Sequence, residues 1–317
     1  MPSQQYLALE QRLKVHDQLA PAEMLALARS GDADALFKAS ELSLRGMTGK
    51  IDLKAAYKFM SEAAAKGQAE AKRAQAYYLA AGIGTKADPI RARKLLSKIA
   101  ESDRFVAVQL AFLNHLGCAE RVKSAKREIV SEDPHIEVVQ GLFSPEECRY
   151  IQLLANPWME PAMIYSTAGA VRDPHRDSDN MVVTPMAEDL VIQAINRCIA
   201  EATRTKVQWG EPLHVIRYRP GQQYRPHHDA NTFAAAEDRR IATAIIYLNG
   251  AYEGGETHFP KLGLRVRGAV GDMLVFHNLK PDKEMEPRAM HAGLPILSGE
   301  KWIATRWIRG RNYFGRG

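Results

Sequence analysis

The stretch "IATAIIYLNGAYEGGETHFP", residues 241–260, decides the fold class of the C-terminal half. It begins with β-branched and apolar residues and then breaks at an Asn-Gly pair and a Gly-Gly pair, as a short strand followed by turns does. Similar short segments surround it: "LHVIRYRP" (213–220), "GLRVRG" (263–268), "GDMLVFHN" (271–278), "MHAGLPI" (290–296) and "KWIATRWIRG" (301–310). Short strands in series with such turns predict a β-sandwich or barrel-like core.

Two helices are expected to brace this core. In "PHIEVVQGLFSPEECRYIQLLAN", residues 134–156, a strand is followed by a helix with Ser144 as N-cap, Pro145 at the first position and Glu147 completing a capping box. A second helix is predicted to begin at Thr184-Pro185 and to run to residue 202.

The first 120 or so residues are rich in Ala and Leu and contain an internal repeat with an offset of about 36 residues. Gly31, Gly46 and Asp52 recur as Gly67, Gly82 and Asp88, and half-units flank the two copies. Each copy predicts two helices joined by a glycine-containing turn, and a plain helical bundle is the alternative. The unit resembles the Sel1-like branch of the tetratricopeptide class, which implies protein or peptide interaction.

A charged stretch, "AERVKSAKREIVSED" (119–133), separates the halves. We therefore expect an α+β chain of two domains. Residues 1–125 form a helical repeat solenoid, and residues 126–317 form the strand-rich domain.

Composition excludes several classes of protein. The 317 residues carry a formal net charge of +6 without a block of like charges, so a nucleic-acid partner is not indicated. There is no apolar run of membrane-spanning length and no signal-like N-terminus. The three cysteines are far apart without CxxC spacing, which argues against a disulfide framework and a cysteine zinc site, and we expect a reducing cytoplasm.

The segment "GQQYRPHHDAN" (221–231) offers candidate metal ligands. In an extended chain His227 and Asp229 share a face, while His228 points away. A third ligand must come from elsewhere, and His258, His277 and His291 are the candidates. His291 is favoured because a hairpin through "SGE" would bring it beside Lys301. Two histidines and one carboxylate suit a non-haem Fe(II) oxygenase.

Together, "YRPGQQYRPHHD", "RIATAIIYLNGAYEGGETHFP", "GAVGDMLVFHN" and "MHAGLPILSGEKWIATRW" resemble the prolyl 4-hydroxylase-type 2-oxoglutarate- and Fe(II)-dependent dioxygenases. The resemblance covers roughly residues 133–315 and implies a double-stranded β-helix (jelly-roll) core. It implies His227, Asp229 and His291 as catalytic iron ligands, and Lys301 with Tyr218 as partners of the distal 2-oxoglutarate carboxylate.

Arg176 falls where many family members have an Arg-Thr-Ser stretch, but Asp177 replaces the Thr. Thr243 and Thr257 are interpreted as packing residues on β-branched strands. Trp302 and Trp307 are interpreted as core residues.

The resemblance also implies Fe(II), 2-oxoglutarate and dioxygen, with ascorbate as an optional reductant. It leads us to expect hydroxylation of a prolyl residue in a peptide or protein, with release of succinate and CO2, and recruitment of the polypeptide by the N-terminal repeats. Two alternatives stay open. One is the same chemistry on another side chain, such as Asp, or on a small molecule; the other is a catalytically weak interaction scaffold.

Overall fold

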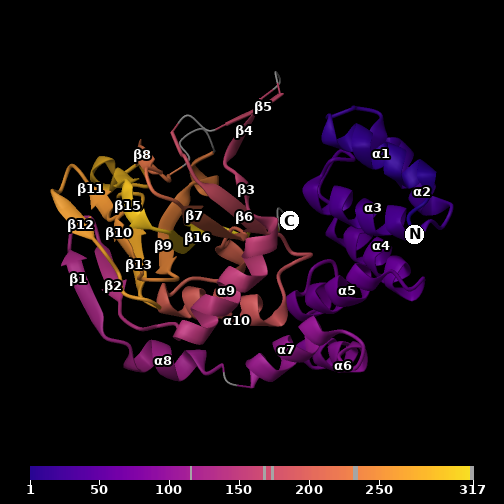
Figure 1. Ribbon diagram of the computed structural model, residues 1–317, viewed down its shortest axis with the longest axis horizontal. Helices are drawn as coiled ribbons and strands as arrows, with labels where there is room; N and C mark the ends of the chain where they lie inside the picture. The colour runs from indigo at the N-terminus through magenta and orange to yellow at the C-terminus, as the bar shows by residue number, and fades with distance from the viewer. Residues whose placement is uncertain (115, 167–168, 173–174, 231–234, 315–317) are drawn as a thin grey trace. The chain divides into compact units, whose positions relative to one another are not determined.

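The computed structural model describes residues 1–114, 116–166, 169–172, 175–230 and 235–314. The chain divides into two units (Figure 1). The helical unit contains Met1–Leu116 together with Pro185–Gln193, and the strand-rich unit contains Gly117–Thr184 and Ala194–Gly317. The second segment of the helical unit lies far from the first in sequence, and the repeat pattern gave no sign of it.

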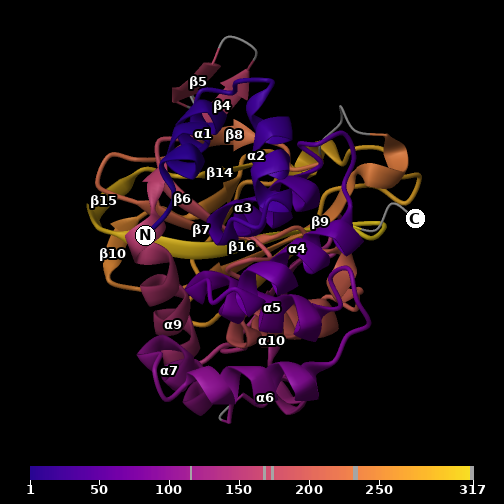
Figure 2. The ribbon, with the colours of Figure 1, turned by 90° about the vertical axis from the view of Figure 1, so that its right-hand side faces the viewer.

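Successive helices of the helical unit lie side by side (Figure 2). Their bounds are α1 (Gln4–Lys14), α2 (Ala20–Arg29), α3 (Ala33–Arg45), α4 (Leu53–Ala65), α5 (Ala69–Ala81), α6 (Pro89–Ile99) and α7 (Arg104–Leu113). The starts of α3 and α4 recur 36 residues later as the starts of α5 and α6, which is the offset of the sequence repeat.

The repeated residues have local structural reasons. The carboxylates of Asp52 and Asp88 accept hydrogen bonds from the first turns of α4 and α6. Gly46 and Gly82 end α3 and α5 in the left-handed region, with φ of 70° and 76°, where a side chain is disfavoured. The repeat therefore encodes where helices begin and end.

In the strand-rich unit, the helices are α8 (Cys118–Ser124) and α9 (Pro145–Ala155), with the C-terminal part of α10 (Leu190–Ala202). Short 3-10 helices are η1 (Asn156–Trp158), η2 (Val207–Trp209), η3 (Ala236–Asp238) and η4 (Pro287–Ala289). The strands are β1 (Arg127–Ser131), β2 (Ile136–Val139), β3 (Glu160–Pro161), β4 (Met163–Ser166), β5 (Gly169–Arg172), β6 (Asp179–Val183), β7 (Leu213–Tyr218), β8 (Tyr224–His227), β9 (Arg240–Tyr247), β10 (Tyr252–Gly254), β11 (Thr257–Phe259), β12 (Leu264–Val266), β13 (Met273–His277), β14 (His291–Gly293), β15 (Ile296–Gly299) and β16 (Lys301–Arg309).

Two antiparallel sheets form the core of this unit. Among the described residues, the larger sheet has the order β1-β2-β13-β9-β16-β7-β6-β3, and the smaller has the order β12-β11-β14-β8. Alternate apolar residues from both sheets form one buried cluster, which includes Ile245, Tyr247, Phe259, Phe276 and Ile303. The result is the predicted jelly-roll-like antiparallel core.

The opposite face of the larger sheet is also buried. Gln152 of α9 donates to the carbonyl of Leu248, and Arg306 of β16 donates to the carbonyl of Asn196 in α10 (2.6 and 2.9 Å). The capping box of Ser144 and Glu147 is present. The predicted start of α10 at Pro185 is wrong, because the helix begins at Leu190 and Asp189 caps it by accepting from the backbone N–H of Ile192.

The cysteine spacing, which argued against a disulfide framework, did not indicate that one pair would form a disulfide. Cys118 in α8 and Cys198 in α10 form a disulfide with Cα atoms 5.4 Å apart, while Cys148 is free and buried. The two residues are 80 positions apart in sequence, so the fold of the strand-rich unit, and not local spacing, brings them together. No described helix is long and apolar enough to cross a membrane.

Candidate active site

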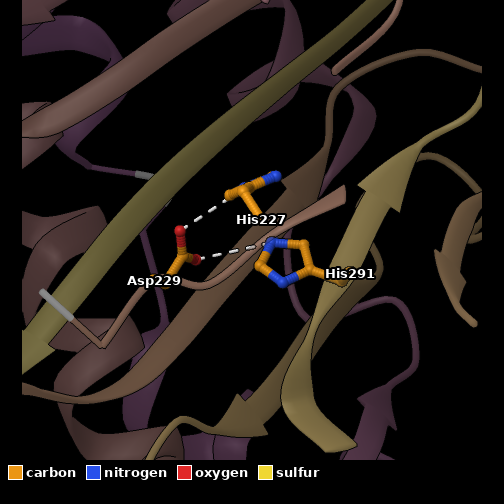
Figure 3. A group of neighbouring side chains, drawn as sticks. All are labelled: His227, Asp229 and His291. Atoms are coloured by element: carbon orange, nitrogen blue, oxygen red, sulfur yellow. Dashed lines mark ion pairs between the residues drawn. The ribbon is translucent and has the colours of Figure 1, made fainter. Parts of the chain in front are cut away.

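Three side chains from the smaller sheet and its connecting bend come together inside the core (Figure 3). His227 ends β8, Asp229 lies in the bend that follows, and His291 begins β14. His291 pairs directly with His227 across the two antiparallel strands, which is why the two imidazoles meet. One ligand atom from each residue lies within 4.8 Å of the others, and no other such cluster occurs among the described residues.

Hydrogen bonds fix the tautomers of both histidines. Nδ1 of His227 lies 2.8 Å from the carbonyl oxygen of Arg225, and Nδ1 of His291 lies 3.1 Å from that of Ala289. A carbonyl only accepts, so each Nδ1 carries the proton and each Nε2 presents a lone pair. Both Nε2 atoms face Asp229, at 3.6 and 3.5 Å from its oxygens.

The charges in the cluster suit a cation. Burial, together with the neighbouring His291, lowers the pKa of the His227 imidazole to about 4, so His227 is neutral near pH 7. Burial alone would raise the pKa of the Asp229 carboxyl, but His291 and His227 outweigh it and the pKa falls to about 2. Neutral imidazole and ionised carboxylate are the forms that bind a metal.

The rings of the histidines are held by aromatic side chains. Tyr224 stacks on His227 with ring centres 3.5 Å apart and planes 18° apart. Phe276 packs edge-on against His291 at 4.6 Å. These contacts fix the ring orientations before any metal binds, and the His-Asp-His donor set with apolar neighbours fits Fe(II).

Lys301 lies in the same cavity as the His-Asp-His cluster. It is surrounded there by Ile216, Ile245, Ile303 and Tyr218. Its side chain is buried, and its ammonium donates to the carbonyl oxygen of Gly255 at 2.6 Å. Burial lowers the pKa of this group to about 8. Within the described residues, no carboxylate forms an ion pair with Lys301, so an apolar cavity holds a cation ready for an anionic ligand.

The hairpin expected between His291 and Lys301 is wrong. His291 belongs to the smaller sheet, whereas Lys301 begins β16 of the larger sheet, where it pairs with Tyr218. Between them, β15 pairs with β10 instead of β16. The chain therefore changes sheet, and the two residues meet across the cavity. His228 lies outside the cluster, as do His258 on β11 and the exposed His277 on β13.

Other residues have roles that the sequence did not indicate. Thr243, interpreted as a packing residue, donates a hydrogen bond to Asp229 at 2.8 Å. Thr257 bonds to the hydroxyl of Tyr247 at 3.1 Å and lines the cavity. Trp307 is buried as expected but also lines the cavity, and Arg176 lies over the ring of Tyr224 at 5.4 Å. The sequence offered one sign of the contact between Thr243 and Asp229, which is that strand alternation places Thr243 on the inward face of β9.

The sequence is similar to those of known proteins. A sequence model of the 2OG-Fe(II) oxygenase superfamily matches residues 213–309. Prolyl 4-hydroxylase 1 of Arabidopsis thaliana is 36% identical over 208 residues, which cover 60% of this chain and 74% of that protein. A putative prolyl 4-hydroxylase of Acanthamoeba polyphaga mimivirus is 32% identical over 197 residues, covering 57% and 78%.

A solved structure is similar as well. The viral collagen prolyl hydroxylase vCPH of Paramecium Bursaria Chlorella virus-1, in complex with 2OG, is 31% identical and has a TM-score of 0.46. The match covers 56% of this chain and 96% of that one.

Proposed function

Because the chain belongs to the prolyl 4-hydroxylase family of 2-oxoglutarate- and Fe(II)-dependent oxygenases, we propose that it hydroxylates a prolyl residue of a peptide or protein. The observation that carries the proposal is a single cavity that contains a His-Asp-His cluster at one place and, at another, a buried lysine that forms no ion pair within the described part of the chain. A metal at the cluster and a dicarboxylate reaching Lys301 would occupy that cavity together.

The side chains have distinct tasks in this proposal. Nε2 of His227, Nε2 of His291 and one oxygen of Asp229 hold the metal, and three protein ligands leave positions free for other molecules. Lys301 binds the distal carboxylate of 2-oxoglutarate as a point charge, and Tyr218, its buried neighbour across the strand pair, lies beside the same group.

When bound, Fe(II) with 2-oxoglutarate and dioxygen supplies the oxidation that yields succinate, CO2 and the hydroxylated product, and ascorbate serves as an added reductant. The protein contributes orientation and exclusion of water. The apolar walls formed by Ile216, Ile245 and Ile303 keep the ionic contacts of Lys301 out of bulk solvent, where they would be weaker.

For the N-terminal helices we propose Sel1-like repeats that bind the polypeptide substrate. Two observations support this: the helix pairs recur with the offset of the sequence repeat, and the matched superfamily region, 213–309, lies outside them. A polypeptide substrate gives such a unit a purpose that a small molecule would not.

Succinate release in the presence of different acceptors tests the substrate class. We expect turnover with a proline-rich peptide, a gain of one oxygen on its proline by mass spectrometry, and no stimulation by free proline. Asp229→Ala should abolish the gain. Stimulation by free proline alone, or by a peptide without proline, would refute prolyl hydroxylation of a polypeptide.

Deletion of residues 1–116 tests recruitment by the helices. We expect slower turnover of a protein substrate with unchanged turnover of 2-oxoglutarate in the absence of substrate. The second measurement checks that the remaining chain is folded. Equal turnover of the protein substrate by both forms would contradict recruitment.

A further inference from the structure

Asp229 has a buried contact besides the two histidines. The hydroxyl of Thr243 on β9 lies 2.8 Å from Oδ2 of Asp229, and Nδ2 of Asn278 lies 2.9 Å from that hydroxyl. Asp229, Thr243 and Asn278 are 5%, 0% and 2% exposed. The carboxylate is therefore the end of a three-residue chain of hydrogen bonds that water does not reach.

The chemistry of these groups fixes the direction of the chain. An ionised carboxylate only accepts hydrogen bonds, so the single proton of the Thr243 hydroxyl points to Asp229. That hydroxyl can then only accept from Asn278, which must present its NH2 group and not its carbonyl. The donors run in one direction, from Asn278 through Thr243 to Asp229.

This orientation leaves a polar atom without a partner. The side-chain Oδ1 of Asn278 is buried and has no hydrogen-bond partner among the described residues. A buried acceptor without a partner is unfavourable, and most side chains avoid it. The backbone of Asn278 is held on both sides: its N–H donates to Ile241 and its carbonyl accepts from Glu286, each at 2.9 Å. The side chain is thus kept in an orientation that serves Thr243.

The chain also distinguishes the two oxygens of Asp229. Each oxygen faces one imidazole, Oδ1 the Nε2 of His227 at 3.6 Å and Oδ2 the Nε2 of His291 at 3.5 Å, but only Oδ2 also receives the hydroxyl proton of Thr243. An oxygen that already accepts a strong hydrogen bond is a poorer metal ligand than one with both lone pairs available. Oδ1 is therefore the oxygen left to bind a cation.

We propose that Thr243 and Asn278 are positioning residues that orient Asp229 to bind the metal through Oδ1 alone. The inference rests on the proposed iron site and deepens it. Single-oxygen binding keeps coordination positions free for the other molecules of the reaction. Partners of this kind commonly change metal affinity by ten- to a hundredfold when removed.

The test compares two substitutions of Thr243 that separate hydrogen bonding from packing. Thr243→Val keeps the branched shape and removes the hydroxyl, whereas Thr243→Ser keeps the hydroxyl and removes a methyl group. Thr257→Val is the matched control, because it removes a buried hydroxyl from the same cavity without touching Asp229. Asn278→Ala tests the outer link. Mn²⁺ affinity of the full chain by calorimetry, thermal unfolding without metal and the visible spectrum of the Co²⁺ complex are measured for each.

We expect Thr243→Val to weaken Mn²⁺ binding at least tenfold and to alter the Co²⁺ spectrum. Asn278→Ala should weaken binding by a smaller factor, and Thr243→Ser and Thr257→Val should bind as the unchanged protein does. In the metal-free protein, both Thr243 variants should unfold at a lower temperature than the unchanged protein: Thr243→Ser because it leaves a small cavity, and Thr243→Val because Asn278 and Asp229 lose a hydrogen-bond partner.

Two results would overturn different claims. If the affinity follows packing, so that Thr243→Ser binds Mn²⁺ as weakly as Thr243→Val or more weakly, the positioning role is wrong while the iron site stands. If the unchanged protein does not bind Mn²⁺, the iron site itself is refuted.

Discussion

The affinity for 2-oxoglutarate should depend on pH through Lys301. Burial lowers the pKa of its ammonium to about 8 from an ordinary 10.5, because the cavity walls replace the water that would solvate the charge. A bound carboxylate favours the charged form, so binding requires the proton. Affinity must therefore be highest below about pH 8 and must fall as the pH rises through the pKa.

The size of the effect follows from this pKa. At pH 7 about 90% of the free protein carries the proton on Lys301, and at pH 9 about 10% does, so the dissociation constant for 2-oxoglutarate should rise about tenfold. Calorimetry on the Mn²⁺-loaded protein, in buffers of different ionisation enthalpy, should detect uptake of roughly half a proton per ligand at pH 8.

Lys301→Met supplies the control, because Met fills similar space without charge. Losing one partner of a buried ion pair costs about 2 kcal/mol or more, which corresponds to at least a thirtyfold weaker affinity. The variant should show no pH dependence between pH 7 and 9. A flat profile for the unchanged protein, or the same slope in Lys301→Met, would refute the assignment of the distal carboxylate to Lys301.

Three further predictions address other parts of the molecule. His227→Ala should lose Mn²⁺ binding while His228→Ala keeps it, since only the first residue belongs to the cluster; equal loss by calorimetry would contradict the ligand set. Reduction of the Cys118–Cys198 bond, or Cys198→Ser, should lower the free energy of unfolding by about 4 kcal/mol, because the bond closes a loop of 80 residues. The same denaturant midpoint with and without reductant would refute a stabilising crosslink. Gly271→Ala should strongly destabilise the strand-rich unit, because φ is 85° and the added Cβ would lie 1.9 Å from the backbone oxygen of Phe143. Thermal unfolding within a few degrees of the unchanged protein would show that this reasoning is wrong.

Some features were predictable because they depend on neighbours in sequence. The helix caps at Asp52, Asp88 and Ser144 follow from side chains that bond within one turn of their own helix. The strands β7, β9, β13 and β16 are predicted by runs of apolar residues. Both faces of these strands are buried, one in the core and one under the helices. Local chemistry decided these elements, so the sequence was sufficient.

Other features depend on which strands pair, and local chemistry does not set that. The prediction placed His291 and Lys301 on one hairpin because the intervening turn residues permit it. In the structure the chain leaves the smaller sheet after β14, and β15 pairs with β10, so the two residues line the cavity from different sheets. The Cys118–Cys198 pair and the contact of Asn278 with Thr243 likewise span 80 and 35 positions, and no spacing rule relates such distant residues.

Three unfavourable polar groups of the strand-rich unit belong to the proposed site and its supporting hydrogen bonds. Lys301 is a buried cation without a counter-ion among the described residues, Asp229 is a fully buried carboxylate, and Oδ1 of Asn278 is an acceptor without a described partner. Each is costly in an apolar core unless something compensates it. In the proposed site, a metal would compensate Asp229 and a dicarboxylate would compensate Lys301. These two costs would therefore be relieved by the molecules that the site is proposed to bind. The cost at Asn278 is not relieved in this way, which fits a residue that orients a metal ligand and does not itself bind the metal.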